Sequence, residues 1–123
     1  MQIVDANVIL RYLLNDHAEL FISAVQIIEN NDIYVPFEVA AEVVYVLEKV
    51  YHVPRLEISE SLSILISYPD ISFNDKEIII EALKIYKGKK IDFVDTLLIA
   101  YNRIKGYKVH TFDKQLNNLL YHE

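Results

Sequence analysis

The sequence predicts an α/β fold with a short, mainly parallel sheet of about four strands. Four short segments have the length and composition of strands, at residues 2–4, 33–35, 71–73 and 108–111. Stretches with helical spacing of apolar residues separate these segments. Because parallel strands need long crossover connections, this alternation favours a largely parallel sheet with helices on both faces.

In the first half of the chain, strand 2–4 ends at Asp5 and a helix is expected over 8–14. Asp16 is expected to cap a second helix that ends at residues 30–32. Strand 33–35 stops at Pro36, since proline cannot donate to a sheet ladder. The helix predicted over 38–51 carries an apolar stripe of four valines: Val39, Val43, Val46 and Val50.

In the second half, a helix over 57–67 precedes strand 71–73, and Asn74 or Asp75 can cap a helix over 76–86. The helix over 93–105 ends at Gly106, which is the residue type that most often terminates helices. The fourth strand is predicted over 108–111, and Asp113 opens a helix that runs to Leu120. We find no repeat, linker or low-complexity segment, so we expect a single domain over 1–123.

Composition limits the classes of protein that fit. With 123 residues and 53% hydrophobic content, the chain can bury a core and leave apolar surface for a partner. The longest apolar run, 43–47, is far shorter than a bilayer span, and no basic region precedes the first strand. We therefore expect a cytoplasmic protein without a membrane partner. Its lack of cysteine excludes thiolate metal sites.

Charge is distributed unevenly along the chain. The net charge is −6, which argues against simple electrostatic binding of nucleic acid. Residues 84–114, however, hold eight basic and three acidic residues, a local balance of +5. This segment is either a solvated lysine-rich loop around Gly88 or a rim that faces phosphate groups next to an acidic pocket.

Carboxylates recur where strands end or helices begin. Asp5 and Asp113 each follow a predicted strand, at the sheet edge where α/β proteins form their sites, and each can equally be an N-cap. Asp92 and Asp95 flank one helix start at i, i+3, and a single cap is enough there. Glu42 lies roughly 75° from the centre of the valine stripe, so periodicity alone makes it a solvated glutamate.

Oxygen ligands without cysteine or paired histidine favour Mg²⁺ or Mn²⁺ over zinc. The four histidines have no ligand spacing and are expected to be structural or surface residues: His17, His52, His110 and His122. Carboxylates crowded on one rim repel each other, and a divalent ion relieves that repulsion. Such ions keep positions for water and phosphate oxygens, which indicates phosphoryl chemistry.

Four stretches together resemble motifs of the PIN-domain family, particularly the ribonuclease toxins of VapBC toxin–antitoxin systems. They cover nearly the whole chain in the family's order. The first is a hydrophobic strand followed by Asp-x-Asn, and the second contains Glu42. In the third, Asp95 precedes Leu-Leu-Ile-Ala, and the fourth ends in Thr-Phe-Asp-Lys. In this sequence the four stretches are residues 3–14, 35–47, 92–100 and 109–114.

The resemblance implies a PIN-like three-layer α/β/α sandwich and a metal-dependent endoribonuclease. It implies hydrolysis of RNA phosphodiesters by water activated on Mg²⁺ or Mn²⁺. The catalytic and metal-binding quartet would be Asp5, Glu42, Asp95 and Asp113, with Asp92 as a secondary ligand or cap and Asn7 and Thr111 in support. The expected rim for RNA phosphates comprises Lys87, Lys89, Lys90 and Lys114.

The resemblance also implies a cognate antitoxin protein as a partner and a homodimer. Two alternatives remain open at this point. One is a catalytically inactive PIN scaffold that binds RNA or an antitoxin-like protein. The other, ranked lower, is a haloacid-dehalogenase-like phosphatase with Asp5 as nucleophile; Asn7 stands where that class needs a second acid that can donate a proton.

Overall fold

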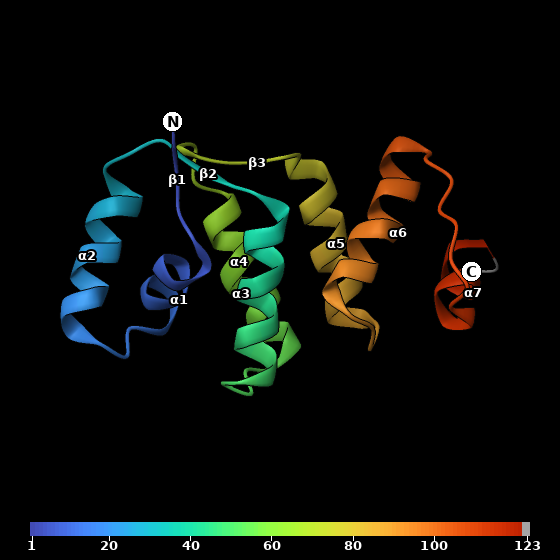
Figure 1. Ribbon diagram of the computed structural model, residues 1–123, viewed down its shortest axis with the longest axis horizontal. Coiled ribbons are helices and arrows are strands. Elements are labelled where there is room, and N and C mark those ends of the chain that lie inside the picture. Colours follow the sequence, from blue (N-terminus) through green and yellow to red (C-terminus); the bar gives the residue numbers. More distant parts are fainter. Residues whose placement is uncertain (122–123) are drawn as a thin grey trace. The chain divides into compact units, whose positions relative to one another are not determined.

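Residues 1–121 of a computed structural model form seven helices and three strands (Figure 1). The chain divides into two compact units, Met1–Lys76 and a second that begins at Glu77. In the first unit the elements are β1 (Gln2–Ile3), α1 (Ala6–Leu14), α2 (Ala18–Glu29), β2 (Ile33–Val35), α3 (Phe37–Lys49), α4 (Arg55–Ile66) and β3 (Ile71–Phe73). The remaining helices are α5 (Lys76–Gly88), α6 (Phe93–Lys105) and α7 (Lys114–Tyr121). Of the four histidines, His122 lies outside the described residues.

The sheet has the order β1-β2-β3, and both pairs of strands are parallel. Ile33 in the central strand pairs with Gln2 on one side and Ile71 on the other. The side chains of Ile33, Val35 and Ile71 are buried, as apolar residues at alternating strand positions predict. The mixed α/β class with a short parallel sheet is therefore confirmed, with three strands rather than four in residues 1–121.

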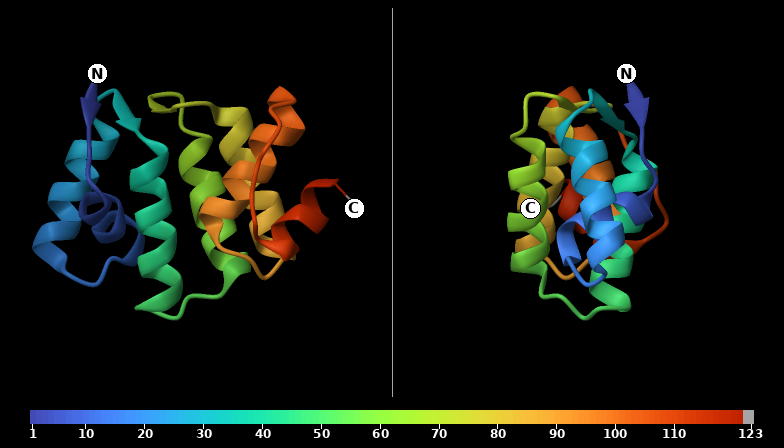
Figure 2. Two further views of the ribbon diagram at one scale, coloured as in Figure 1. Left: turned by 45° about the vertical axis from the view of Figure 1, so that its right-hand side comes forward. Right: turned by 90° about the vertical axis from the view of Figure 1, so that its left-hand side faces the viewer.

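The strand predicted over 108–111 does not form. Its backbone groups bind side chains of α7 instead of a neighbouring strand. The Tyr121 hydroxyl accepts a hydrogen bond from Val109 N at 3.0 Å and donates one to Val109 O at 2.6 Å. Asn117 Nδ2 donates to Thr111 O at 2.9 Å. Because these partners satisfy the polar groups that a ladder would use, the segment runs to α7 as an extended loop (Figure 2).

In the first unit, α1 packs between α2 and α3, and α3 also contacts α4 (Figure 1). The valine stripe predicted for α3 is partly wrong. Val43 is buried, but Val50 is 60% exposed. The buried face of α3 is formed by Phe37, Ala40, Val43, Val44 and Leu47. Small and large residues at helical spacing thus define a face that is rotated away from the all-valine stripe.

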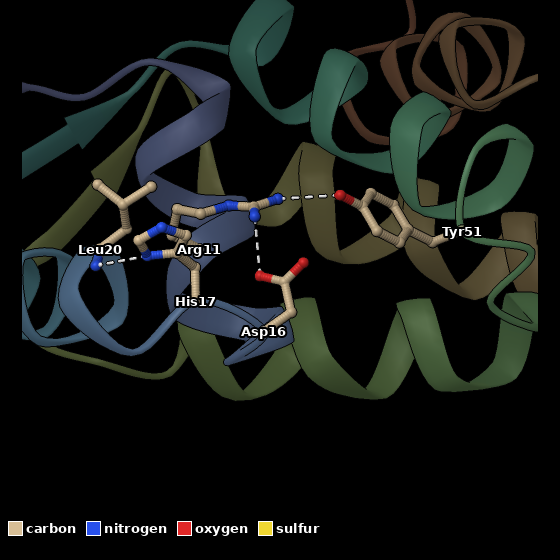
Figure 3. A network of polar contacts seen from close by, with 5 residues as sticks. All are labelled: Arg11, Asp16, His17, Leu20 and Tyr51. Atoms are coloured by element: carbon tan, nitrogen blue, oxygen red, sulfur yellow. Dashed lines mark hydrogen bonds and ion pairs between the residues drawn. The ribbon is translucent and has the colours of Figure 1, made fainter.

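The cap of α2 also differs from expectation. His17, not Asp16, is the N-cap residue, and its Nδ1 accepts a hydrogen bond from Leu20 N at 3.3 Å. Asp16 instead binds Arg11 Nη1 at 2.8 Å, while Arg11 Nη2 donates to the Tyr51 hydroxyl at 3.0 Å (Figure 3). An ion pair with Arg11 therefore occupies the carboxylate that was predicted to cap, and the network joins α1 to the end of α3.

Asn74 likewise serves a helix other than the one predicted. Its Oδ1 accepts a hydrogen bond from Phe37 N at 2.8 Å. Pro36, the N-cap residue of α3, makes no side-chain cap hydrogen bond. Asn74 thus supplies from the end of β3 an acceptor for the first turn of α3, within the first unit. None of the helices in residues 1–121 is long and apolar enough to cross a membrane.

Candidate active site

Asp5 lies where β1 gives way to α1. Val4 before it is buried, whereas Asp5 itself is exposed and extended. Its side chain accepts a hydrogen bond from Val8 N at 3.2 Å through Oδ1. The N-cap interpretation is thus confirmed. One carboxylate oxygen serves the cap, and the other is available for a different ligand.

Two other residues of the proposed site lie in the same unit. Glu42 is exposed on α3, about 160° around the helix from the centre of the buried face. Asn7 is exposed and lines a cavity of about 150 Å³ with Arg11 and residues of α2. The exposure of Glu42 agrees with the solvated position that periodicity predicts, and its role in a site stays a prediction.

In the second unit, the pKa of Asp95 is affected by two other aspartates. Burial raises the pKa of Asp95, and the negative charges of Asp92 and Asp113 raise it further. Asp92 is the N-cap residue of α6, yet its side chain makes no cap hydrogen bond. Asp95 lies in the first turn of the same helix. The i, i+3 pair is therefore not a hydrogen-bonded cap, and Asp95 also experiences the negative charge of Asp113 from a different segment.

Asp113 is held by hydrogen bonds on both sides. Its Oδ1 accepts from Leu116 N at 2.7 Å, in the first turn of α7. Its backbone N donates to Thr111 Oγ1 at 3.1 Å. The Thr111 side chain therefore holds the backbone of Asp113, and its role in supporting a site stays a prediction. Asn117 Nδ2 in turn donates a hydrogen bond to the backbone carbonyl oxygen of Thr111.

The lysines expected to form the phosphate rim are all exposed: Lys87, Lys89, Lys90 and Lys114. The first three follow one another at the end of α5 and in the loop beyond it, and Lys114 is the first residue of α7. Exposure is what binding of phosphate requires, because a buried ammonium group would already need an acid partner. It is equally what a solvated loop predicts, so the rim stays a prediction.

The donor chemistry of the aspartates fits a divalent cation. Carboxylate oxygens are hard ligands, and an acid whose pKa is raised by neighbouring acids gains most when a cation joins them. Within residues 1–121, however, no three His, Cys, Asp or Glu side chains are gathered closely enough to hold a metal. The quartet Asp5, Glu42, Asp95 and Asp113 therefore stays a prediction as a metal centre.

Sequence reasoning missed two residues that hold the Asp113 segment, Asn117 and Tyr121. Their i, i+4 spacing on one helix was visible and places both side chains on one face of α7. Nothing in the spacing says which backbone that face meets. The spacing alone therefore does not predict that these side chains bind the backbone of 109–111, because that segment is itself predicted to pair in the sheet.

The comparisons with known proteins bear on this arrangement. Neither the curated proteins nor the solved structures give a match. The profile of the PIN domain matches residues 3–119, which covers both units and all four acids of the predicted quartet. PIN domains are generally nucleases and typically use divalent metals, so the match indicates a nuclease-type function. The chain belongs to the PIN-domain family.

Proposed function

We propose that this PIN domain is a metal-dependent endoribonuclease of the VapC toxin type. One observation carries the proposal most strongly. Asp95 is partly buried, and two further acids act on it from its own helix start and from the Thr111–Asp113 segment. Acids whose pKa is raised by burial and by neighbouring negative charges cluster at functional sites, which supports the proposal.

The residues that would hold the metal are Asp5, Asp95 and Asp113, with Asp92 as a secondary ligand. A bound Mg²⁺ or Mn²⁺ would lower the pKa of a water and offset charge on the phosphodiester. Glu42 would act as a further ligand or as the base that orients that water. The cap hydrogen bonds fix one oxygen each of Asp5 and Asp113, which leaves the second oxygen of each for this purpose.

The lysine rim would bind phosphates that flank the scissile bond. We expect the affinity for RNA to fall as salt rises, because each phosphate contact releases counterions. Replacing Lys87, Lys90 and Lys114 with glutamine should weaken binding and flatten the salt dependence. Lys49→Gln in α3 is the matched control, since it removes one exposed lysine from the first unit.

The proposal includes a cognate antitoxin, a homodimer and a cytoplasmic location. Basic side chains of an antitoxin would complement the acidic site and displace its metal. Apolar side chains remain exposed on the first unit, among them Ile22, Tyr45 and Leu56, and would suit protein contacts. An inactive scaffold would keep these partners and lack turnover.

The deciding experiment is cleavage of a structured RNA pool by purified, antitoxin-free protein with Mn²⁺, Mg²⁺ or EDTA. The wild type should cut only with metal, and Asp5→Asn and Asp95→Asn should each lose at least about 100-fold in rate. Asp32→Asn is the control, because it makes the same chemical change at an exposed acid outside the quartet. Absence of cutting with every metal, or equal cutting by the two site variants, would favour the inactive scaffold.

A further inference from the structure

Phe112 is the most exposed large apolar side chain of residues 1–121, at 106% of its reference area. It lies directly before Asp113, in the loop 106–113 between α6 and α7. A phenylalanine held fully in water gains nothing for folding, since the hydrophobic effect rewards only burial. The exposure of this ring directly beside an acid of the proposed site leaves it accessible to a ligand.

The backbone that carries Phe112 is fixed on both sides. Thr111 O accepts from Asn117 Nδ2, and Asp113 N donates to Thr111 Oγ1. Asp113 Oδ1 then caps the first turn of α7. Because these hydrogen bonds flank Phe112, its ring is presented from a defined backbone rather than from a loose loop. A preorganised ring loses less conformational entropy when it binds.

Besides Asp113, the residues within a few positions of Phe112 in the chain include basic and aromatic side chains. Lys108, His110 and Lys114 are all exposed. Tyr107, at the start of the loop, is 60% exposed and stacks on Tyr101 at 6.2 Å between ring centroids and 10° between planes. Aromatic rings placed among basic side chains are typical of surfaces that bind single-stranded nucleic acid, where bases stack and cations hold phosphates.

We propose that Phe112 is a substrate-positioning residue, which stacks on a base of an unpaired RNA nucleotide beside Asp113. This rests on the proposed function for the choice of RNA as ligand. Both faces of a base inside a duplex are covered by its neighbours, so an exposed ring can stack only on a base that has left the helix. Lys108 and Lys114 lie on either side of Phe112 in the chain and bind the phosphates of that nucleotide.

The same ring is less suited to an interface with another protein. The core of a protein interface is depleted of charge and formed by contiguous apolar side chains. Phe112 instead has Thr111 and Asp113 as chain neighbours, and lysines lie within the next few residues. A single ring with this charged surrounding favours a polyanion that offers a flat face, and a protein contact is an outcome that the test separates.

The test measures binding in EDTA, so that it does not depend on cleavage. The probes are a fluorescent single-stranded RNA, the same strand with abasic sites, and a matched RNA duplex. We expect Phe112→Leu to bind the single strand about tenfold or more weakly, with little change for the abasic strand or duplex. Ile104→Ala, which removes another exposed apolar side chain of the second unit, should bind like the wild type.

A second variant keeps the test informative if Phe112→Leu proves unstable. The chain has no tryptophan, so Phe112→Trp introduces a single reporter. It should retain affinity for the single strand, and its fluorescence should be quenched by that strand but not by the abasic strand. Retained affinity without quenching would place the base elsewhere and overturn the proposal.

Three outcomes distinguish this inference, a protein interface and the proposed function from one another. If Phe112→Leu binds every probe as the wild type does, the stacking assignment is wrong even when the protein cleaves RNA. If the variant alters the oligomeric state in sedimentation and leaves RNA binding intact, Phe112 belongs to a protein interface. If single-strand binding depends on Phe112 but no metal supports cleavage, the inference stands and the nuclease assignment fails.

Discussion

Asp5 and Asp113 hold equivalent places in the sequence but are supported differently in the two units. Each follows a run of residues that the sequence predicts as a strand, and each caps a helix through Oδ1. The run before Asp5 is β1, which pairs with β2 in a parallel ladder. The run before Asp113 has no ladder and is held by Thr111, Asn117 and Tyr121. The same acidic cap can thus rest on a sheet or on the side chains of a helix.

The difference teaches what a strand pattern can specify. Residues 108–111 place the β-branched residues Val109 and Thr111 at alternating positions and precede a capping acid, as a strand can. Whether such a segment enters a sheet depends on whether its backbone N–H and C=O groups bind a neighbouring strand or other groups of the protein. In the second unit a tyrosine hydroxyl takes both polar groups of Val109, so the strand pattern ends as a loop.

The largest effects should come from buried side chains of each unit. Ile33 is 1% exposed in the central strand. Tyr86 is 0% exposed and packs edge-on against Phe93, with 5.7 Å between the ring centroids. Ile33→Ala and Tyr86→Ala should each cost about 2–5 kcal/mol in free energy of unfolding, because they leave cavities. Thermal unfolding by calorimetry measures the loss.

These two variants also test the prediction of a single domain. If the two units fold as one, each variant should lower the same single transition. Two transitions, one sensitive to Ile33→Ala and the other to Tyr86→Ala, would contradict a single domain. Ile22→Ala is the control, since its side chain is 57% exposed and its loss should change stability little.

The next effect sharpens the contrast between ladder and side-chain support. Tyr121→Phe removes the hydroxyl that serves both Val109 N and Val109 O. We expect a cost of about 1 kcal/mol, because these backbone groups are only partly buried and water can replace the hydroxyl. Hydrogen exchange should report faster opening at the Val109 amide and no change at Ile33, which a ladder protects.

Tyr45→Phe is the matched control for this variant. Its ring is 63% exposed on α3, and the same hydroxyl deletion there should leave stability unchanged within about 0.5 kcal/mol. Cleavage by Tyr121→Phe should fall moderately, because Asp113 depends on the loop that Tyr121 holds. Unchanged exchange at Val109 would show that other contacts hold the loop.

The sequence predicted the local elements of the structure better than the contacts between distant elements. The three strands of the first unit and the helix 93–105 agree with the structure nearly residue for residue, because apolar periodicity and capping residues are local signals. The caps at Asp5 and Asp113 were also predicted. The partners of Asp16, Asn74 and Val109 were not, since each lies on an element that only the folded chain brings close.

The candidate site divides in a similar way. Spacing identified Asp92 and Asp95 as a pair, and the structure adds the influence of Asp113 on Asp95. Glu42 could be singled out only through the resemblance to the PIN family, since it is exposed and off the buried face of its helix. Periodicity reports burial, and a site residue that faces solvent gives no periodic signal.

The pKa of Asp95 predicts how stability should depend on pH. Since burial and two negative neighbours raise it, the folded protein binds this proton more tightly than the unfolded chain. Ionised Asp95 therefore costs stability at neutral pH, and the cost disappears as pH falls below about 4, the ordinary value for aspartate. Asp95→Asn should raise the melting temperature at pH 7 and lose that advantage near pH 3.

Mn²⁺ should reduce the difference in stability between the wild type and Asp95→Asn at pH 7. A metal that binds only the folded state stabilises it in proportion to the logarithm of its concentration. The wild type should therefore gain more from Mn²⁺ than Asp95→Asn, which lacks one charged ligand. Equal gains in the two proteins would place the metal away from Asp95.

The smallest effects compare the two caps directly. Asparagine is about as good an N-cap as aspartate, so Asp5→Asn and Asp113→Asn should each change the free energy of unfolding by only a few tenths of a kcal/mol. Asp5→Ala and Asp113→Ala lose the acceptor and should each cost about 1 kcal/mol. If Asp113→Ala costs clearly more than Asp5→Ala, the cap of α7 also stabilises the loop that Tyr121 holds, whereas β1 keeps its ladder without help from its cap. Chemical denaturation of the four variants measures these differences, and equal costs for the two alanine variants would mean that the loop and the ladder depend on their caps to the same degree.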